Sequence, residues 1–206
     1  MYQILEKRRL SSNVVLLVID APYVAKKAEP GQFIILRVDA DGERIPLTIS
    51  AYDREKGTIT IVVQEVGATT MKLGQMNEGD CLHDFVGPLG KASEFDGIKK
   101  AAVVGGGLGC AIALPQAQKL HDMGVDVDLI AGFRNTDAII LEDEMKGACS
   151  RLTLVTDDGS NGHKGFVTDA LKELIEASNK YDVVIAIGPM IMMKFVCKTT
   201  EPYGIK

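Results

Sequence analysis

A cluster of glycines carries the clearest chemistry in the chain. The stretch AAVVGGGLGC places Gly105, Gly106, Gly107 and Gly109 between a short β-branched run and a helix-like segment. Glycine admits positive φ and lets a phosphate approach the backbone, and a helix N-terminus presents N–H groups with a partial positive charge. The turn therefore predicts a pyrophosphate site. Cys110 stands where the G-x-G-x-x-G fingerprint would have its last glycine, so a turn that only packs a helix on a strand is the alternative.

An acidic loop bears on which nucleotide would bind. The stretch TDDGSNGHKG brings Asp157 and Asp158 to the end of a strand candidate at 151–156. Carboxylates there could accept hydrogen bonds from a free ribose 2′-hydroxyl and would repel a 2′-phosphate. Arg134, which follows another strand candidate, favours the phosphate. On balance the sequence favours NAD(H) over NADP(H).

The same loop also contains the residue types of a hydrolytic triad. Asp157, Ser160 and His163 lie within seven residues of one another. No strained G-x-S-x-G turn surrounds Ser160, so an ordinary polar loop is the preferred interpretation and a hydrolase the alternative.

Two stretches of the first half could hold further anionic groups. In ERIPLTISAYD, Arg44 and Thr48 fall on a predicted strand, where alternate residues share a face, so Arg44, Pro46, Thr48 and Ser50 would point the same way. An arginine and two hydroxyls could hold a phosphate and a flavin edge, although on spacing alone a solvent-facing strand is the preferred interpretation.

The second stretch is VGATTMKL. Here Gly67, Thr69 and Thr70 open a short predicted helix. They make either a second anion site or a simple N-cap.

Two patterns of elements must position these residues. β-branched runs separated by turn residues predict an antiparallel barrel or sandwich up to about residue 97. From residue 99, strands alternating with helices predict a parallel sheet, with ligands at the carboxyl ends of its strands. We expect the boundary within 94–100, giving domains 1–97 and 98–206. The expected strands are 13–20, 32–38, 45–51, 57–64, 101–105, 126–132, 151–156 and 182–188, and the expected helices of the second half are 108–122, 137–146, 165–178 and 189–197.

Composition excludes several classes of protein. The 206 residues carry a net charge of −5 and form no basic stretch, so nucleic acid is not an expected partner. No leader segment and no apolar run of about 18 residues is present, so we expect a cytoplasmic protein without a membrane partner. The four cysteines form no Cys-x-x-Cys pair, so no metal cluster built from this sequence alone is expected.

The motifs together resemble a known family. The strand around Thr48, the Gly-x-x-Thr helix start, the GPLG turn at 87–90 and the glycine-rich turn are similar to the ferredoxin–NADP reductase superfamily. The stretches DDGSNGHKGFVTD and IGPMIMMK narrow the resemblance to the FAD- and NAD-binding small subunits of NADH-dependent reduced ferredoxin:NADP oxidoreductase and of sulfide dehydrogenase. The electron-transfer subunit of dihydroorotate dehydrogenase B is a close relative. The resemblance covers nearly the whole chain.

This resemblance implies a two-domain flavoprotein, with FAD on an N-terminal antiparallel β-barrel and NAD(H) on an α/β domain. A hydride would pass between the nicotinamide C4 and the flavin N5, and no catalytic side chain or metal ligand is assigned. By position, the resemblance gives FAD the residues Pro46, Leu47, Thr48, Ile49, Gly67, Thr69 and Thr70, with Arg44 beside them. It gives the nicotinamide nucleotide Gly105, Gly106, Gly107, Gly109, Asp157, Asp158, Gly188, Pro189 and Met190. Arg134 joins these candidates on its own position after a predicted strand, not through the resemblance.

Three departures from the family pattern qualify this assignment. Ile45 stands where the superfamily arginine usually lies, and Arg44 is one residue earlier, so Arg44 could face away from the phosphates. Ile187 replaces a cysteine that many relatives have. The relatives bind a [2Fe–2S] cluster through a cysteine-rich tail, which would follow EPYGIK, so we expect a chain truncated before that tail.

The resemblance also names partners. Electrons would pass to a larger iron–sulfur flavoprotein subunit or to ferredoxin. One alternative is the electron-transfer subunit of a dihydroorotate dehydrogenase. Another, of a different class, is a non-catalytic module that senses NAD(H) and binds no flavin.

Overall fold

The computed structural model describes residues 2–177 and 180–206. The chain divides into two compact units, Met1–Ser93 and Glu94–Lys206. The expected boundary segment, 94–100, begins where the second unit begins.

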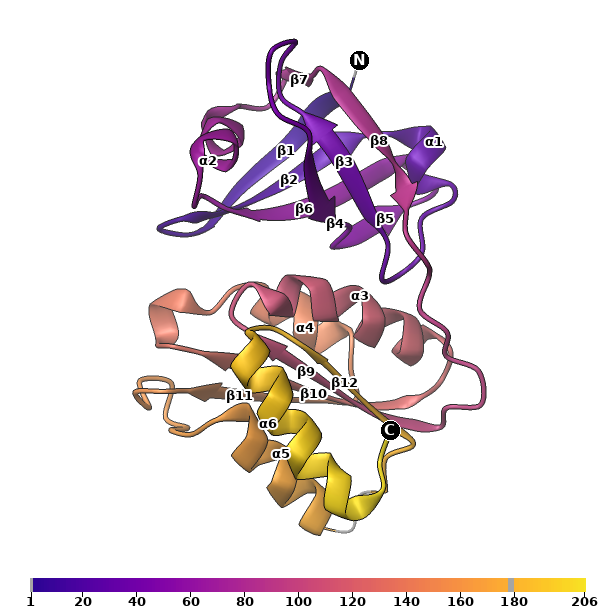
Figure 1. Ribbon diagram of the computed structural model, residues 1–206, viewed down its shortest axis with the longest axis vertical. Helices are drawn as coiled ribbons and strands as arrows, with labels where there is room; N and C mark the ends of the chain where they lie inside the picture. The colour runs from indigo at the N-terminus through magenta and orange to yellow at the C-terminus, as the bar shows by residue number, and fades with distance from the viewer. Residues whose placement is uncertain (1, 178–179) are drawn as a thin grey trace. The chain divides into compact units, whose positions relative to one another are not determined.

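The first unit consists of two antiparallel sheets around one apolar core (Figure 1). One sheet has the strand order β5-β6-β2-β1-β7 and the other β4-β3-β8. The core contains Leu17, Ile34, Ile61 and Phe85, each no more than 2% exposed. The elements are β1 (Tyr2–Ser11), β2 (Val14–Asp20), α1 (Pro22–Ala25), β3 (Phe33–Arg37), β4 (Ile45–Thr48), β5 (Ala51–Asp53), β6 (Thr58–Gln64), α2 (Ala68–Gln75), β7 (Cys81–Leu82) and β8 (Asp84–Leu89).

The second unit is a parallel sheet with helices on both faces. The strand order is β11-β10-β9-β12, and every pairing is parallel. Figure 1 shows α3 and α4 on one face and α5 and α6 on the other. The strands are β9 (Lys100–Gly106), β10 (Asp126–Phe133), β11 (Arg151–Thr156) and β12 (Val183–Ile187), and the helices are α3 (Gly109–Asp122), η1 (Thr136–Ala138), α4 (Glu142–Gly147), α5 (Val167–Glu176), α6 (Met190–Thr200) and η2 (Glu201–Tyr203). The predicted fold class, antiparallel followed by parallel, is confirmed.

The strand predicted at 45–51 is wrong in one respect, because it breaks in the middle. The Ile49 N–H donates to the Gln32 carbonyl, and the Ser50 N–H donates to the Thr60 carbonyl. The chain therefore crosses from the three-stranded to the five-stranded sheet at these two residues. Ser50 is only 3% exposed, so it does not share an outer face with exposed Pro46.

Other local predictions also need correction. The helix expected at 137–146 is two pieces, η1 and α4, separated by Leu141 in the left-handed region with φ of 56°. The GPLG stretch is not a free turn, since its first three residues end β8 and only Gly90 follows the strand. Strand β1 was not predicted, because charged residues fill most of its exposed positions.

Candidate nucleotide and flavin sites

A pocket of about 660 Å³ opens in the second unit. Its walls come from the carboxyl ends of β9, β10 and β11 and from the first turns of α5 and α6. This is the edge at which open parallel sheets bind ligands. Of the residues predicted for a nucleotide, the lining includes Gly106, Gly107, Arg134, Asp157 and Pro189.

Two glycines of the turn face this pocket. Gly107 has φ of +55°, and a Cβ built there meets nothing within 4 Å. Its N–H donates to the Gly132 carbonyl at 2.9 Å, which ties the turn to β10. A Cβ on Gly106 would come within 2.5 Å of the Met192 sulfur. The positive φ favours glycine at position 107, whereas a Cβ at position 106 would have to displace the Met192 side chain. Both residues leave backbone beside the pocket, as a phosphate cradle requires.

The other two glycines of the turn pack helix against sheet. A Cβ on Gly109 would overlap the Ile187 carbonyl oxygen, and one on Gly105 would lie 2.7 Å from the Cys110 sulfur. Neither residue lines the pocket. The packing interpretation therefore describes these two, while the cradle interpretation describes Gly106 and Gly107.

The turn between β12 and α6 meets the glycine turn. A Cβ on Gly188 would approach the Gly106 nitrogen at 3.1 Å, so the two backbones lie close together. Pro189 caps α6 and lines the pocket. Met190 is 82% exposed and does not line the pocket.

The two acidic residues after β11 have different surroundings. Asp157 lines the pocket, as does Arg134 after β10. The Asp158 carboxylate instead accepts the Ser160 N–H at 2.9 Å, and this hydrogen bond holds the pKa of Asp158 below its ordinary value. Asp157 is therefore the carboxylate placed to meet a ligand.

The hydrolase alternative has no support in this geometry. The Ser160 hydroxyl is hydrogen-bonded to the backbone N–H and the hydroxyl of Thr136, at 2.8 and 2.9 Å. The backbone of His163 bonds to Asn161 and Thr156. Within residues 2–177 and 180–206, no hydrogen bond joins Ser160 to the side chain of His163 or Asp157.

On the first unit, β4 presents one face outward. Ile45 and Leu47 pack against the core, and Ile49 is 1% exposed. Pro46 and Thr48 occupy the opposite face. A flavin on this strand would therefore meet the side chains of Pro46 and Thr48, and only the backbone of Leu47 and Ile49.

Helix α2 uses its two threonines differently. The Thr70 hydroxyl accepts the Gly67 N–H at 2.9 Å and donates to the Gly67 carbonyl at 3.0 Å, so from the third helical position it holds the backbone of the N-cap residue, Gly67. The Thr69 hydroxyl donates to the Glu43 carboxylate at 3.2 Å. Because this hydroxyl can donate to an anionic oxygen, it suits a pyrophosphate that takes the place of the Glu43 carboxylate at the helix start.

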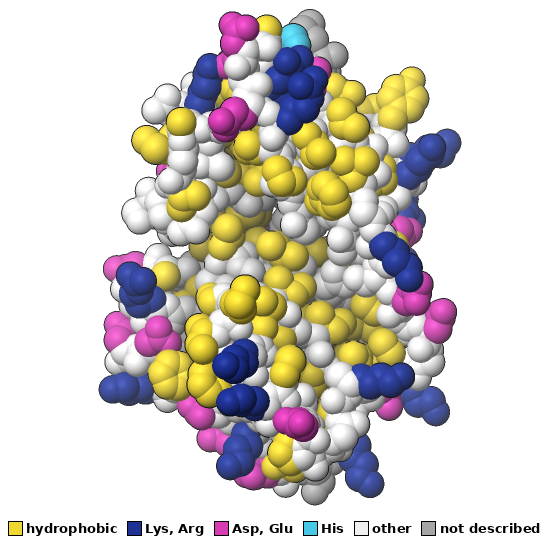
Figure 2. All heavy atoms as spheres, in the orientation of Figure 1, with side chains coloured by type: hydrophobic (Ala, Val, Ile, Leu, Met, Phe, Trp, Pro, Cys, Tyr) yellow, Lys and Arg dark blue, Asp and Glu magenta, His cyan; other side chains and the backbone are white. Residues whose placement is uncertain are grey.

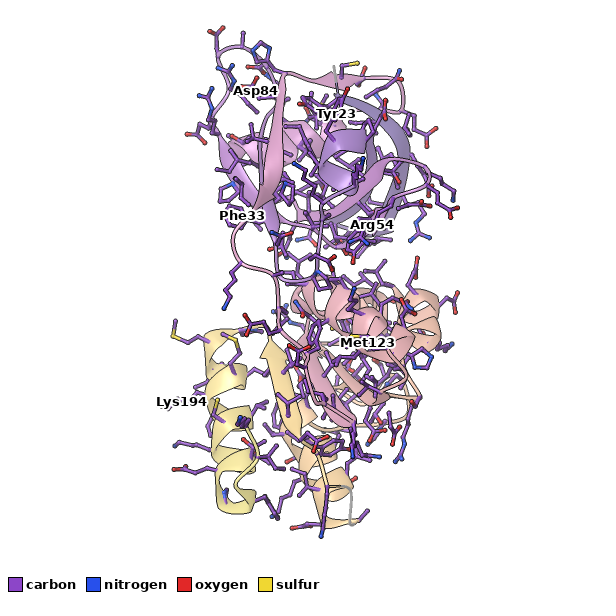
Figure 3. The ribbon with its side chains drawn as sticks, turned by 90° about the vertical axis from the view of Figure 1, so that its right-hand side faces the viewer. Tyr23, Phe33, Arg54, Asp84, Met123 and Lys194 are labelled. Atoms are coloured by element: carbon purple, nitrogen blue, oxygen red, sulfur yellow. The ribbon has the colours of Figure 1, made fainter. Side chains whose placement is uncertain are left out.

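Arg44 lies immediately before β4 and not on it, which corrects the sequence prediction. Its guanidinium pairs with Asp84 at 3.3 Å, and Arg37 pairs with the same carboxylate oxygen at 2.8 Å. Figure 3 shows Asp84 and Phe33 at opposite ends of the first unit. Because Phe33 pairs with Thr48, Arg44 lies at the far end of β4 from Thr48.

Among the described residues, no group of cysteine, histidine or acidic side chains could hold a metal ion. All four cysteines are free thiols, and burial raises the pKa of Cys110 to about 12. The described chain therefore does not fit a [2Fe–2S] cluster. No helix among these residues combines the length and apolarity needed to cross a membrane.

Sequence reasoning missed the apolar lining of the pocket, including three side chains that are half or more exposed. Phe166, Ile191 and Phe195 line it while remaining 63%, 60% and 50% exposed. Figure 2 shows hydrophobic side chains gathered on the face that carries α6, with Lys and Arg beside them. The sequence signal for these residues was their closeness to two motifs, since Phe166 lies in GFVTD and Ile191 follows IGPM. Residue type alone does not reveal which side chains are exposed.

Comparison with known proteins accounts for both units. Residues 1–93 match the oxidoreductase FAD-binding domain family, and residues 103–198 match the oxidoreductase NAD-binding domain family. The two matches fall on the two structural units.

Three individual proteins are similar over almost the whole chain. A Clostridium beijerinckii protein known as an uncharacterized protein in the adh 3′ region is 50% identical, over 100% of this chain and 72% of its own. A Thermotoga maritima homolog of the dihydroorotate dehydrogenase B (NAD(+)) electron transfer subunit is 41% identical, over 98% of this chain and 71% of its own. A solved structure of the NADH-dependent reduced ferredoxin–NADP oxidoreductase, studied for flavin-based electron bifurcation, superposes with a TM-score of 0.92 at 39% identity, over 100% of this chain and 74% of the other.

Proposed function

The chain belongs to the ferredoxin–NADP reductase family of FAD- and NAD-binding oxidoreductases, and on this premise we propose how its residues divide the work. Residues 1–97 hold FAD and residues 98–206 hold NAD(H). When both cofactors are bound, they would supply hydride transfer between the nicotinamide and the flavin. The observation that carries this proposal is the pocket at the carboxyl edge of the parallel sheet, with Gly107 and Asp157 in its wall.

The FAD side rests on two anchors. Thr69 and the first turn of α2 hold the pyrophosphate, in the place where the Glu43 carboxylate now accepts the Thr69 hydroxyl. The outer face of β4, with Pro46 and Thr48, supports the flavin ring. When bound, FAD supplies the hydride-accepting ring and the change from two-electron to one-electron transfer. The protein binds and orients this ring, and Thr70 maintains the helix start.

The nucleotide side rests on the pocket. Gly106 and Gly107 let the pyrophosphate approach the backbone at the start of α3. Asp157 accepts a hydrogen bond from the ribose 2′-hydroxyl and disfavours a 2′-phosphate, so NADH is the preferred nucleotide. Arg134 lies in the same wall and moderates this preference.

The partner is a larger iron–sulfur flavoprotein subunit. This proposal is supported by the 39% identity and the TM-score of 0.92 with the reduced ferredoxin–NADP oxidoreductase chain. The second candidate is a dihydroorotate-oxidising subunit, favoured by the 41% identical Thermotoga maritima homolog. Two mixing experiments on the FAD-loaded chain separate the candidates. The iron–sulfur flavoprotein partner should rapidly re-oxidise the flavin of the NADH-reduced chain, whereas a dihydroorotate-oxidising partner supplied with dihydroorotate should rapidly reduce the flavin of the oxidised chain.

Flavin uptake tests the proposal against the nucleotide-sensing alternative. The full chain is mixed with FAD, passed through a desalting column and assayed for bound flavin. We expect close to one FAD per chain, with NADH still able to bind. A chain that binds NADH but retains no FAD would support the sensing module instead.

A further inference from the structure

We propose that Ser160 is a positioning residue for nucleotide selectivity, because its hydroxyl closes a hydrogen-bond ladder that keeps Arg134 and Asp157 apart in the pocket wall. Ser160 itself does not line the pocket. The inference rests on the proposed nucleotide site and adds the element that holds its two charged residues in place.

The ladder extends the pairing of β10 with β11. The last paired residues of the two strands are Phe133 and Thr156. Beyond them, the Asp157 N–H donates to the Phe133 carbonyl at 3.0 Å. The Asp158 N–H then donates to the Arg134 carbonyl at 3.4 Å, a longer and weaker bond. The two loops therefore continue side by side past the ends of the strands.

Ser160 supplies the final rung with its side chain. Its oxygen accepts the Thr136 N–H at 2.8 Å and is also hydrogen-bonded to the Thr136 hydroxyl at 2.9 Å. The Ser160 N–H is in turn held by the Asp158 carboxylate at 2.9 Å. The next residue anchors the loop to β11, since the Asn161 amide donates to the Leu154 carbonyl at 3.0 Å. The rung is thus fixed on both sides.

This arrangement determines whether the opposite charges of Arg134 and Asp157 can pair. Arg134 and Asp157 follow neighbouring strands and face one pocket, and no ion pair joins them within the described parts of the chain. An unpaired carboxylate discriminates against a 2′-phosphate, whereas one neutralised by a guanidinium does not. Without the Ser160 rung, the loops beyond the Asp157–Phe133 bond are joined by the weaker 3.4 Å bond from Asp158 to Arg134. The loops can then shift until the two charges pair.

The test compares Ser160→Ala with a matched control. Ser150→Ala removes a hydroxyl that likewise accepts a backbone N–H, from Val127 at 3.2 Å, at the amino ends of the same two strands. Dissociation constants of NADH and NADPH are measured by titration calorimetry on the full chain, with the melting temperature recorded for each variant. Ser160→Thr keeps the hydroxyl and serves as the rescue variant.

We expect Ser160→Ala to lower the preference for NADH over NADPH about fivefold. Ser160→Thr should retain the preference for NADH. Ser150→Ala should lower the melting temperature but leave the preference for NADH unchanged. An unchanged preference in Ser160→Ala, or an equal loss in Ser150→Ala, overturns the inference while leaving the nucleotide site intact. A wild-type chain that binds neither nucleotide overturns the proposed function and the inference together.

Discussion

Asp157 and Arg134 line one pocket from the ends of two adjacent parallel strands, and their charges remain unpaired within the part of the chain that the structure describes. One group suits a ribose hydroxyl and the other suits a phosphate. Under the proposed function, we expect the preference between NADH and NADPH to depend on these two side chains more than on the rest of the pocket.

Replacing the acidic member should shift this preference. Asp157→Asn keeps the shape but loses the charge, so NADH binding weakens about tenfold and NADPH binding does not. Dissociation constants for both nucleotides measure the change. Asp158→Asn is the paired variant: because the Asp158 carboxylate caps its own loop, it should lower stability more than selectivity. A larger selectivity change in Asp158→Asn than in Asp157→Asn would contradict the assignment.

The packing role of Gly109 gives a second prediction. A Cβ at Gly109 would overlap the Ile187 carbonyl oxygen, so Gly109→Ala should lower the free energy of unfolding by about 1–3 kcal/mol. Gly147→Ala is the control, since a Cβ there meets nothing within 4 Å and alanine favours a helix. Urea denaturation of both variants measures the difference. Equal stability of the two variants would show that the helix start tolerates the extra methyl group.

The parallel half was the more predictable part of the fold. Each of its strands is a β-branched run followed by turn residues, and the strand predicted at 151–156 is β11. The antiparallel half was less predictable at Ile49 and Ser50, because a change of sheet is a tertiary event. Two adjacent aspartates are also equivalent in sequence. The structure distinguishes them, because Asp157 lines the pocket and the Asp158 carboxylate accepts the Ser160 N–H.

The two threonines of α2 should separate stability from flavin binding. Thr70→Val removes the hydroxyl that holds the backbone of the N-cap residue Gly67, so the free energy of unfolding without flavin should fall by about 1 kcal/mol. Thr69→Val removes the hydroxyl proposed for the pyrophosphate and should weaken FAD binding about tenfold, with a smaller change in stability. Flavin titration and thermal unfolding are both needed. The opposite pattern would place the anion contact on Thr70.

A buried ionic cluster at the amino ends of the strands predicts a pH effect. The Tyr181 hydroxyl donates to Asp128 at 2.5 Å, and Asp128 is also paired with Arg151 at 3.1 Å. Asp128 is 1% exposed, so Tyr181→Phe should cost about 1–3 kcal/mol of stability at neutral pH.

The sign of the pH effect follows from Tyr181. Burial, with the hydrogen bond to Asp128, raises the pKa of Tyr181 in the folded state. Its contribution is therefore fully present below the unfolded pKa of about 10 and is lost as pH rises towards the raised folded value. The free energy of unfolding of the wild type should fall more steeply above this pH than that of Tyr181→Phe. Parallel curves would exclude Tyr181 as the cause.

The most direct test of the central claim is anaerobic stopped-flow mixing of the FAD-loaded chain with NADH and, separately, with NADPH. We expect NADH to bleach the flavin absorption band within the time of a single enzymatic turnover, and NADPH to bleach it more slowly. A bound flavin that neither nucleotide reduces would contradict hydride transfer between the two cofactors.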